Sequence, residues 1–376
     1  MPAVIHQPDT IEKLQILGRD GQYDLACACG STKDEHRKRG PDGNWIYPVI
    51  LPNGGKTTLF KTLVSNACNN DCLYCPLRDK NDVRRCTLGI EETADVFMQY
   101  LHARQVFGLF LSSGLTGDAD KTMARINAIA SIVRRKHGFR GYIHLKILPG
   151  ASPAAIEETL RLASAVSINI ETPGAEYMAK LSQKKDFLKD IVEPMKLISR
   201  LTAKGTRHER VKSTTQFIVG AADETDKKIV RYMTGLYQRL KLSRVYFSAY
   251  QSAPGAESLS AEAENPADRL LREHRLYQTD FLMRKYGFTD TDILFDERDR
   301  LSLEKDPKQL WAEAHPEFFP ININRADKFT LLRVPGLGPR TVRMILDCRK
   351  TGRVNRLEDI MRRGKLLGKA QGYVVF

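Results

Sequence analysis

Three of the seven cysteines in this 376-residue chain lie close together, at Cys68, Cys72 and Cys75. Their spacing is Cys-x3-Cys-x2-Cys, and an aromatic residue, Tyr74, precedes the last cysteine. Three cysteines this close together rarely occur by chance. Thiolates that are close in sequence are typical ligands for metal ions and clusters. The segment therefore predicts a loop that binds a metal or an iron–sulfur cluster.

A structural zinc site is the alternative for this loop. A closed zinc site needs four ligands in tetrahedral geometry, and the segment offers three with no histidine nearby. Cys86 is the candidate for a fourth. A further pair, Cys27 and Cys29, is separated by one residue, which is an uncommon ligand spacing, so we interpret these two as ordinary thiols. Their alternative is a lid or an extra metal contact.

A regular alternation of strand and helix patterns begins near residue 57. Short apolar, β-branched runs indicate strands at residues 58–65, 108–112, 142–148, 166–171, 214–219 and 244–249. Helical periodicity lies between them, at residues 90–104, 121–136, 153–164, 187–204 and 224–240. This order predicts an α/β fold with a parallel sheet, whose ligands bind at the carboxyl ends of the strands. The cysteine segment directly follows the first of these strands.

The cysteine spacing and the alternation together resemble the radical S-adenosylmethionine (radical SAM) enzymes over about 200 residues, 56–255. This resemblance implies a partial (β/α)6 barrel and a [4Fe–4S] cluster held by Cys68, Cys72 and Cys75, with one iron left open for S-adenosylmethionine. It also implies an external electron donor. In such enzymes one electron from the cluster cleaves the sulfonium to give a 5′-deoxyadenosyl radical, which abstracts hydrogen from the substrate.

The resemblance assigns cofactor contacts to particular residues. Tyr74 matches the aromatic residue that lies against the adenine, with simple packing beside the cluster as the alternative. Ser112, Ser113 and Gly114 stand where the family has a Gly-Gly-Glu-like stretch for the methionyl amino group. The chain lacks the acidic residue of that stretch, so backbone carbonyls and serine hydroxyls are expected to receive the ammonium.

Polar residues on two further strands extend this assignment. Ser167, Asn169 and Glu171 alternate with apolar residues and would share one strand face, where they can bind the ribose and carboxylate side of the cofactor. A solvated strand face is the alternative. Lys146, on one face with His144, is the candidate partner of the cofactor carboxylate. The sequence identifies no catalytic hydrogen donor and no radical-quenching residue.

A second motif lies near the C-terminus, where Val-Pro-Gly-Leu-Gly connects two helical patterns. It resembles the helix-hairpin-helix DNA-binding motif. Glycines allow a tight turn and a close approach to phosphate, and the amides that open the next helix can face the anion. The residues expected to contact DNA are Val334, Gly336, Leu337, Gly338, Arg340, Thr341 and Arg343. A helical hairpin that only packs against the barrel is the alternative.

The charge distribution favours a polyanionic partner. The chain has 59 Lys and Arg against 45 Asp and Glu, a net charge of +14. Residues 322–376 contain 13 Lys and Arg and 4 Asp and Glu, so 13 − 4 = +9 of that excess lies in the C-terminal segment. Phosphate contacts of this kind position a protein on DNA without reading its sequence.

The chain is thus expected to have four segments. These are an irregular N-terminal leader at 1–55, the barrel at 56–255, a helical linker region at 256–320 and a small all-α helix-hairpin-helix domain at 321–376. A radical SAM barrel with such a tail resembles the radical SAM proteins assigned to DNA modification or repair whose genes lie beside a uracil-DNA-glycosylase-like gene. That resemblance implies a DNA substrate and a glycosylase-like partner, without a settled reaction.

Two other functions remain open at this point. An RNA-modifying radical SAM enzyme is one, because phosphate contacts do not select the sugar. A non-enzymatic DNA-binding iron–sulfur protein is the other. The sequence shows no secretion signal and no run of 18 apolar residues, and its cysteines are odd in number and clustered. We therefore expect a cytoplasmic protein with no membrane partner.

Overall fold

The computed structural model describes residues 8–21, 43, 45–50, 55–251, 259, 265–362 and 364–376. The chain divides into two units. We call the first the barrel unit; it comprises the described residues up to Glu224 together with Gly235–Arg269. The second, the tail unit, comprises Thr225–Thr234 and Leu270–Phe376. Cys27 and Cys29 lie outside the described residues.

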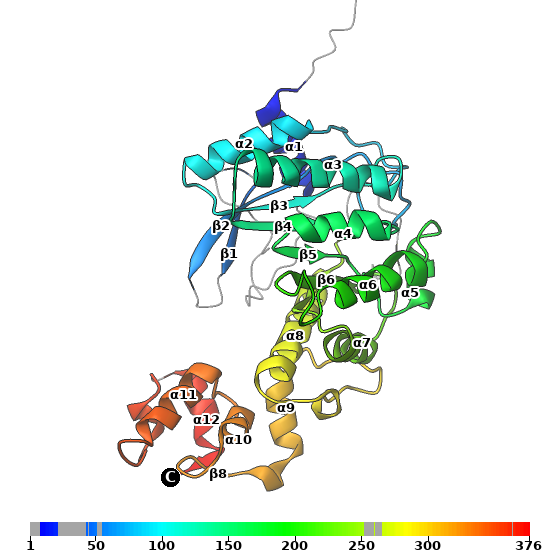
Figure 1. The fold of residues 1–376 in the computed structure, drawn as a ribbon. Coiled ribbons are helices and arrows are strands. Elements are labelled where there is room, and N and C mark those ends of the chain that lie inside the picture. The colour runs from blue at the N-terminus through cyan, green and yellow to red at the C-terminus, as the bar shows by residue number, and fades with distance from the viewer. Residues whose placement is uncertain are drawn as a thin grey trace, which may run out of the picture. The chain divides into compact units, whose positions relative to one another are not determined.

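The barrel unit is built on a curled, partial-barrel sheet of seven strands in the described part of the chain (Figure 1). The strands are β1 (Ile46–Ile50), β2 (Lys56–Leu63), β3 (Gly108–Ser112), β4 (Tyr142–Lys146), β5 (Ala165–Ser167), β6 (Lys212–Val219) and β7 (Arg244–Ala249). Their order in the sheet is their order in the chain. β1 pairs antiparallel with β2, and every later neighbouring pair is parallel. The carboxyl ends of β2 to β7 therefore share one edge of the sheet.

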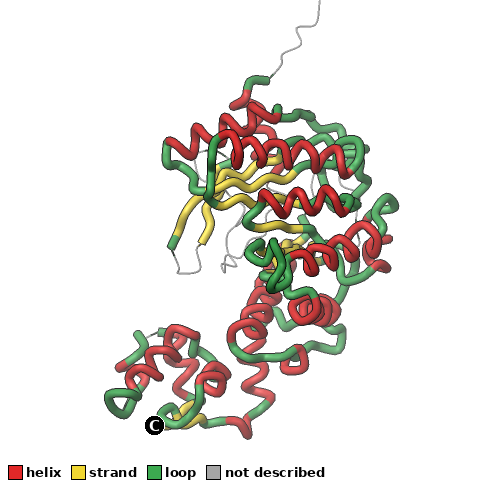
Figure 2. The backbone as a smooth tube through the Cα atoms, in the orientation of Figure 1, coloured by secondary structure: helices red, strands yellow, loops and turns green. Residues whose placement is uncertain are grey.

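Helices pack against one face of this sheet (Figures 1 and 2). Those of the barrel unit are α1 (Thr10–Asp20), α2 (Ile90–His102), α3 (Ala119–Ser131), α4 (Pro153–Leu162), α5 (Ala175–Leu181) and α6 (Glu193–Leu201), while α7 (Asp226–Arg239) is shared with the tail unit. The π-helical segments Ile132–Lys136 and Phe187–Val192 extend α3 and precede α6. Local sequence explains the starts of two of these helices. The Asp118 side chain caps α3, and Ser152 caps α4 with a proline at its first turn.

The two faces of the sheet differ in chemistry. The helix-covered face is apolar and includes Phe60, which meets Phe97 of α2 with ring centroids 6.0 Å apart. The opposite face, which lines the inside of the curled sheet, carries polar, cationic and aromatic side chains. Strand register places Lys61, Phe110 and His144 side by side on it. The hydrophobic core thus lies under the helices, and the inner face is left for polar chemistry.

Three expectations from the sequence are wrong. Residues 1–55 are not uniformly irregular, because they contain α1 and the antiparallel edge strand β1. The fourth expected strand, 166–171, ends at Ser167 as β5. It stops there because the Ile170 amide bonds the Thr215 hydroxyl, and because Glu171 has a φ of +63°, which no strand permits. Helix α5 was not expected.

The tail unit is mainly helical. Its elements beyond α7 are α8 (Pro266–Lys285), which begins in the barrel unit, α9 (Pro307–Ala314), α10 (Lys328–Arg333), α11 (Pro339–Cys348) and α12 (Lys365–Gln371), with short 3-10 turns at Asp290–Asp292, Pro316–Phe318 and Leu357–Asp359. Two short strands, β8 (Ile321–Asn322) and β9 (Val374–Val375), pair in parallel. Among the described residues, no helix has the length and apolarity needed to cross a bilayer.

Candidate cluster and cofactor site

The three clustered cysteines lie on a loop that follows β2, at the carboxyl edge of the sheet. We call residues 66–79 the cysteine loop. Cys72 is buried, Cys68 and Cys75 are half-buried, and all three are free thiols. Burial raises the pKa of the Cys72 thiol, and burial together with neighbouring Cys72 raises the pKa of Cys75 to about 12. Such thiols lose their protons when a cationic group binds between them.

The donor set fits a cluster better than a single ion. Each thiolate of a [4Fe–4S] cluster binds a different iron, so the three sulfurs need not converge on one point. Within the described ranges, no three His, Cys, Asp or Glu side chains form a group that could hold a single metal ion. Cys86 does not complete a zinc site with the loop, because its thiol donates to the Lys13 carbonyl at 3.9 Å.

One arginine fastens the ends of the cysteine loop together. The Arg85 guanidinium donates to four backbone carbonyls at 2.6–2.9 Å, those of Asn66, Leu77, Arg78 and Asn81. These carbonyls lie outside any strand or helix that could supply N–H donors. The Arg85 guanidinium supplies the donors in their place. The loop is therefore held in shape from both of its ends.

A distant segment holds the middle of the loop. The Ser182 hydroxyl and the Gln183 amide donate to the two carboxylate oxygens of Asp71, and the Lys184 ammonium reaches the Asn69 carbonyl at 2.6 Å. Burial alone would raise the pKa of Asp71, but these hydrogen bonds lower it below its usual value. The aspartate is thus a stable acceptor that ties the loop to the end of α5.

Lys185 brings a positive charge to the same place. Its ammonium donates to the Tyr74 hydroxyl at 3.0 Å and also faces the Cys72 thiol. Burial opposes the charge, yet the nearby Cys72 and Glu171 raise the pKa of Lys185 above its usual value. The Tyr74 ring packs against a small core cluster that includes Leu181, so packing and cofactor contact are both open to it. Burial also raises the pKa of the Tyr74 phenol.

The polar residues expected on the fourth strand take two different positions. Asn169 and Glu171 lie together, with the Asn169 amide 3.4 Å from a Glu171 oxygen, and Glu171 is near enough to the cysteine loop to influence Cys72. The Ser167 hydroxyl instead pairs with His144 Nε2 at 3.0 Å on the inner face. Lys146 lies beside Ser167 in the sheet register. Asn169 and Glu171 thus approach the loop while Ser167 bonds a neighbouring strand, and a shared face for the three residues stays a prediction.

The stretch that follows β3 lies directly against the cysteine loop. A Cβ atom on Gly114 would lie 2.3 Å from the Ala67 carbonyl oxygen and 3.2 Å from the Cβ of Cys68. No residue but glycine allows this approach without a shift of the backbone. The Ser113 hydroxyl donates to the Gly114 carbonyl, and Ser112 is buried at the strand end. This geometry places all three expected residues at the edge of the site.

In the tail unit, part of the expected DNA contact set is internal. Val334 and Leu337 are buried in the core of the unit, so their side chains are unable to reach a ligand. Gly336 has a φ of +84°, and a Cβ there would lie 2.3 Å from the carbonyl oxygen of Leu366 in α12. A glycine is therefore required here by the turn and by helix packing, and a contact of its backbone amide with phosphate stays a prediction.

The remaining residues of that set do face outward. Gly338 precedes α11 in extended geometry, and a Cβ on it would meet only the Tyr286 hydroxyl, at 3.6 Å. Arg340 and Arg343 are exposed on the first turns of α11, and Thr341 between them is half-buried. The amides that open α11 therefore have cations beside them, which suits an anion.

Several residues that shape the cysteine loop carry no sequence signal for a site. Asp71 lies inside the cysteine segment, but an aspartate there is not a ligand of the expected cluster. Arg85, Ser182 and Lys185 carry no spacing signal, since they meet the loop only through the fold. A local pattern identifies the ligands, but the groups that shape the loop around them come from remote segments.

Comparison with known proteins is informative for the barrel unit. The family described as the Radical SAM superfamily matches residues 62–234. Solved structures with similar folds include HydG, a maturase of the [FeFe]-hydrogenase (14% identity, TM-score 0.46, 59% of this chain and 49% of that one). HydG from Carboxydothermus hydrogenoformans (16%, 0.46, 60% and 51%) and methylornithine synthase, PylB (15%, 0.47, 60% and 63%), are further examples. The match spans about half the length of the HydG chains. No curated protein matches the sequence.

Proposed function

We propose that residues 62–234, which match the Radical SAM superfamily, form an enzyme domain that uses a [4Fe–4S] cluster and S-adenosylmethionine, and that the enzyme modifies or repairs DNA. The cluster would be held by Cys68, Cys72 and Cys75. When bound and reduced, it supplies the electron that cleaves the sulfonium of S-adenosylmethionine to a 5′-deoxyadenosyl radical. The observation that carries the DNA substrate is the outward-facing turn at Gly338 with the exposed arginines of α11.

The residues around the cysteine loop would position the cofactor. The backbone carbonyl of Ser113 lies beside the Gly114 contact with Cys68 and can receive the methionyl ammonium. The Lys185 ammonium, beside Tyr74 and Cys72, offers a cation for the carboxylate. Glu171, buried near the loop, is a candidate acceptor for ribose hydroxyls. These groups would bind and orient the cofactor beside the cysteine loop.

The inner face of the sheet supports a nucleotide substrate. The rings of Phe110 and His144 lie 4.3 Å apart, and the Lys61 ammonium lies 4.8 Å from the Phe110 ring centre. Further along the face, the Arg244 guanidinium lies 5.2 Å from the ring centre of Tyr246. Aromatic planes and cations side by side are the side chains that stack on bases and bind phosphate. This face is where a target nucleotide would be held.

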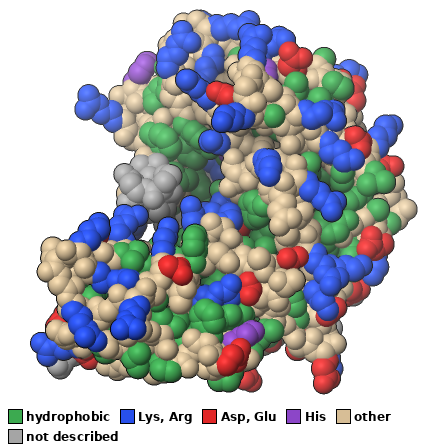
Figure 3. All heavy atoms as spheres, turned by 60° about the horizontal axis from the view of Figure 1, so that its bottom comes forward, with side chains coloured by type: hydrophobic (Ala, Val, Ile, Leu, Met, Phe, Trp, Pro, Cys, Tyr) green, Lys and Arg blue, Asp and Glu red, His purple; other side chains and the backbone are tan. Residues whose placement is uncertain are grey.

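The tail unit supplies the proposed helix-hairpin-helix contact with DNA. The hairpin joins α10 to α11, and the core of the tail unit holds it rigid. Figure 3 shows Lys and Arg side chains spread over the visible face of the molecule. In the described part of the chain, Arg340 and Arg343 make no hydrogen bond; Arg340 is open to phosphate, and Arg343 has only the charge of Asp347 one turn away. Binding of this type is independent of sequence.

Three further elements belong to the proposal. A glycosylase-like protein would act on the product or deliver the lesion, and a cellular reductant would supply the electron. A cytoplasmic location fits free thiols at the cluster site.

The decisive experiment is anaerobic incubation of the reconstituted, reduced protein with S-adenosylmethionine, with and without duplex DNA. The expected result is 5′-deoxyadenosine that increases when DNA is added. The matched single-stranded RNA and DNA serve as controls for the nucleic acid. A yield that RNA raises and DNA does not would favour an RNA substrate, and no cleavage by a fully loaded protein would contradict the enzymatic proposal.

A further inference from the structure

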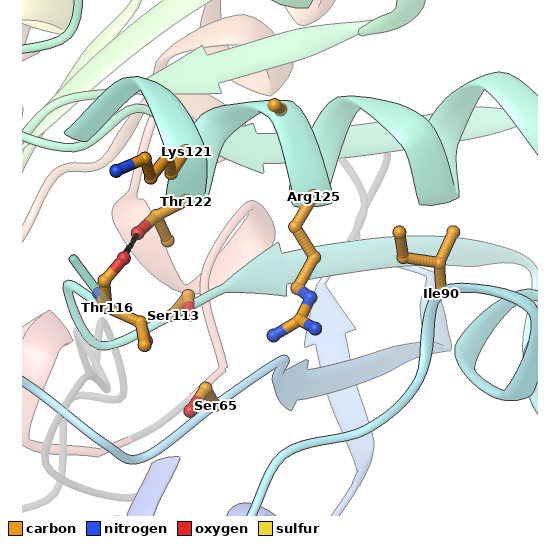
Figure 4. A pocket seen from close by; sticks show the side chains of 8 residues that line it. Ser65, Ile90, Ser113, Thr116, Lys121, Thr122 and Arg125 are labelled. Atoms are coloured by element: carbon orange, nitrogen blue, oxygen red, sulfur yellow. Dashed lines mark hydrogen bonds between the residues drawn. The ribbon is translucent and has the colours of Figure 1, made fainter. Parts of the chain in front are cut away.

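A cavity of about 410 Å³ lies behind the carboxyl ends of β2 and β3 (Figure 4). It is separate from the inner face of the sheet, because helix α3 forms one of its walls. Its polar lining consists of four hydroxyls and two cations, from Ser65, Ser113, Thr116, Thr122, Lys121 and Arg125. No carboxylate is among the residues that line it. The cavity is therefore suited to an anion.

Arg125 is the main cation of this cavity. Figure 4 shows its side chain extending from α3 toward Ser65. Its guanidinium makes no hydrogen bond or ion pair with any residue that the structure describes. Other arginines of the helical layer are engaged: Arg134 donates to three carbonyls and a hydroxyl, and Arg161 pairs with glutamates of its own helix. A half-buried arginine whose five N–H donors are unused is able to bind an anion.

Hydrogen bonds among the hydroxyls and the backbone fix the walls of the cavity, so its two cations are the groups most ready to bind a ligand. Thr122 accepts from the Thr116 amide and donates to its carbonyl, both at 3.0 Å, which fixes the loop after β3. Lys121 is highly exposed, and its 3.2 Å pair with Asp118 is a surface contact of little strength. Its ammonium is free to turn toward a ligand at small cost. The Ser113 hydroxyl can likewise rotate away from its own neighbouring carbonyl.

The position of the cavity connects it with the radical site. Ser113 lines the cavity, and the next residue, Gly114, packs against Ala67 and Cys68 of the cysteine loop. One short stretch of backbone therefore separates the cavity from the first cysteine. A nucleic-acid backbone held here would pass beside the cysteine loop, where the proposed radical would form.

We propose that this cavity binds a backbone phosphate of the DNA strand that carries the target nucleotide. The inference rests on the proposed DNA function and adds a phosphate site within the barrel unit. Arginine presents two parallel donors that match phosphate oxygens, and serine and threonine hydroxyls complete such contacts. A free phosphate ion shares this chemistry, so the test has to separate the two sources.

The test uses the full-length protein and measures its affinity for a short duplex at several salt concentrations. Arg125→Gln should bind about fivefold to tenfold more weakly at 0.1 M salt and lower the slope of log K against log salt by about 0.9. Arg125→Lys should recover part of the loss. The matched control is Arg135→Gln, which removes the same charge about 15 Å further along the helix, where the arginine already pairs with Glu158. The control should bind as the wild type does.

Each outcome decides between the proposals. If the wild type binds DNA and Arg125→Gln binds equally well with the same slope, the cavity is no DNA phosphate site and the tail proposal stands. If that variant instead loses only stabilisation by inorganic phosphate, measured as a shift in melting temperature, the cavity serves a small anion and the inference is overturned. If the wild type shows no affinity for DNA at low salt, the proposed function fails and the inference fails with it.

Discussion

At the scale of single residues, the three cysteines define the chemistry and their neighbours define its geometry. Cys72 is buried and Cys75 has a strongly raised pKa, so both remain protonated thiols unless iron is bound. Arg85 and Lys185 fix the loop around them. The cluster ligands are therefore separable by mutation from the residues that only shape the loop.

Replacing any one of Cys68, Cys72 or Cys75 by alanine should abolish cluster loading, because three thiolates are needed to hold three irons. Iron and sulfide content and the visible absorption of the reconstituted protein measure this. Cys348→Ala is the matched control, since that thiol is exposed on α11, and it should load a full cluster. A triple cysteine variant that still loads iron and cleaves S-adenosylmethionine would disprove the ligand assignment.

Gly114→Ala should separate the β3 loop from the cysteine loop, because its Cβ would lie 2.3 Å from the Ala67 carbonyl oxygen. We expect a loss of roughly 1–3 kcal/mol in unfolding free energy and reduced cluster loading. Urea unfolding and iron content test the two effects. Gly235→Ala is the control: it lies in α7 with no atom within 4 Å of its Cβ, so it should stabilise the protein by roughly 0.5–1 kcal/mol. Equal behaviour of the two variants would show that the contact is unimportant.

At the scale of elements, the hairpin turn between α10 and α11 combines an internal glycine with an outward one. Gly336 packs against α12, while Gly338 opens α11. The two positions look equivalent in the Pro-Gly-Leu-Gly pattern. We expect substitution of Gly336 to lower stability and substitution of Gly338 to lower DNA affinity.

Gly336→Ala should destabilise the tail unit by roughly 2–4 kcal/mol, because alanine is strained at a φ of +84° and collides with the Leu366 carbonyl. Gly338→Ser should leave stability nearly unchanged, since serine is a favoured residue before a helix. Its hydroxyl would occupy the amides that face the anion, so DNA affinity should fall by roughly threefold to tenfold. Urea unfolding and DNA titration separate the two. Unchanged DNA affinity in Gly338→Ser would mean that the turn is structural.

Lys308 of α9 supports this hairpin from within. The residue is 8% exposed, and its ammonium donates to the Leu337 carbonyl at 2.6 Å and lies 4.8 Å from the ring centre of Tyr286. Burial lowers the pKa of Lys308 from 10.5 to about 7, against a smaller opposing effect of Asp306. Between these two pH values the unfolded chain binds a proton that the folded chain has released. The unfolding free energy should therefore rise with pH across that window.

The variant Lys308→Met removes the titrating group and keeps an apolar side chain of similar length. Relative to wild type it should gain stability near pH 6, and the difference should change by an amount on the order of 3 kcal/mol as the pH approaches 10. Urea unfolding of both proteins across pH 6–10 gives this difference directly. A difference that is constant over the whole range would show that Lys308 keeps its ordinary pKa.

At the scale of the whole molecule, the charge excess of the chain is concentrated in its C-terminal segment. Residues 322–376 account for +9 of the total +14. Several of their cations are already paired within the tail unit, such as Arg333 with Asp292 and Lys369 with Asp306. The number of Lys and Arg side chains that make no ion pair determines how many DNA phosphates the protein can neutralise.

DNA affinity should therefore fall steeply with salt and should be the same for duplexes of unrelated sequence. We expect a slope of log K against log salt of roughly −3 to −6, which corresponds to a few phosphate contacts. Fluorescence anisotropy with two unrelated duplexes at several salt concentrations measures both quantities. Strong preference for one sequence, or an affinity that does not respond to salt, would contradict backbone recognition.

Much of the barrel unit could be predicted from sequence, because periodicity and cysteine spacing are local properties. The strands β2, β3, β4, β6 and β7 lie where the apolar runs are. The predicted fourth strand is too long because alternation of polar and apolar residues also occurs in extended loops, and the turn signal Pro173-Gly174 comes only after Glu171. The edge strand β1 is not predicted because Pro48 lies inside it and further prolines and glycines surround it, which together resemble an irregular segment.

The sequence by itself determined the cysteine loop with Cys68, Cys72 and Cys75, the order of most strands and helices, and the basic hairpin at the C-terminus. These follow from spacing, period and charge, which are readable along a chain. Only the tertiary structure decided that Lys185 reaches Tyr74 and Gln183 reaches Asp71, that Gly336 packs against α12, and that Arg125 shares a cavity with Ser113 without a partner among the described residues. The physical reason is that these contacts join segments tens to more than a hundred residues apart, and burial and hydrogen bonding exist only once the chain has folded.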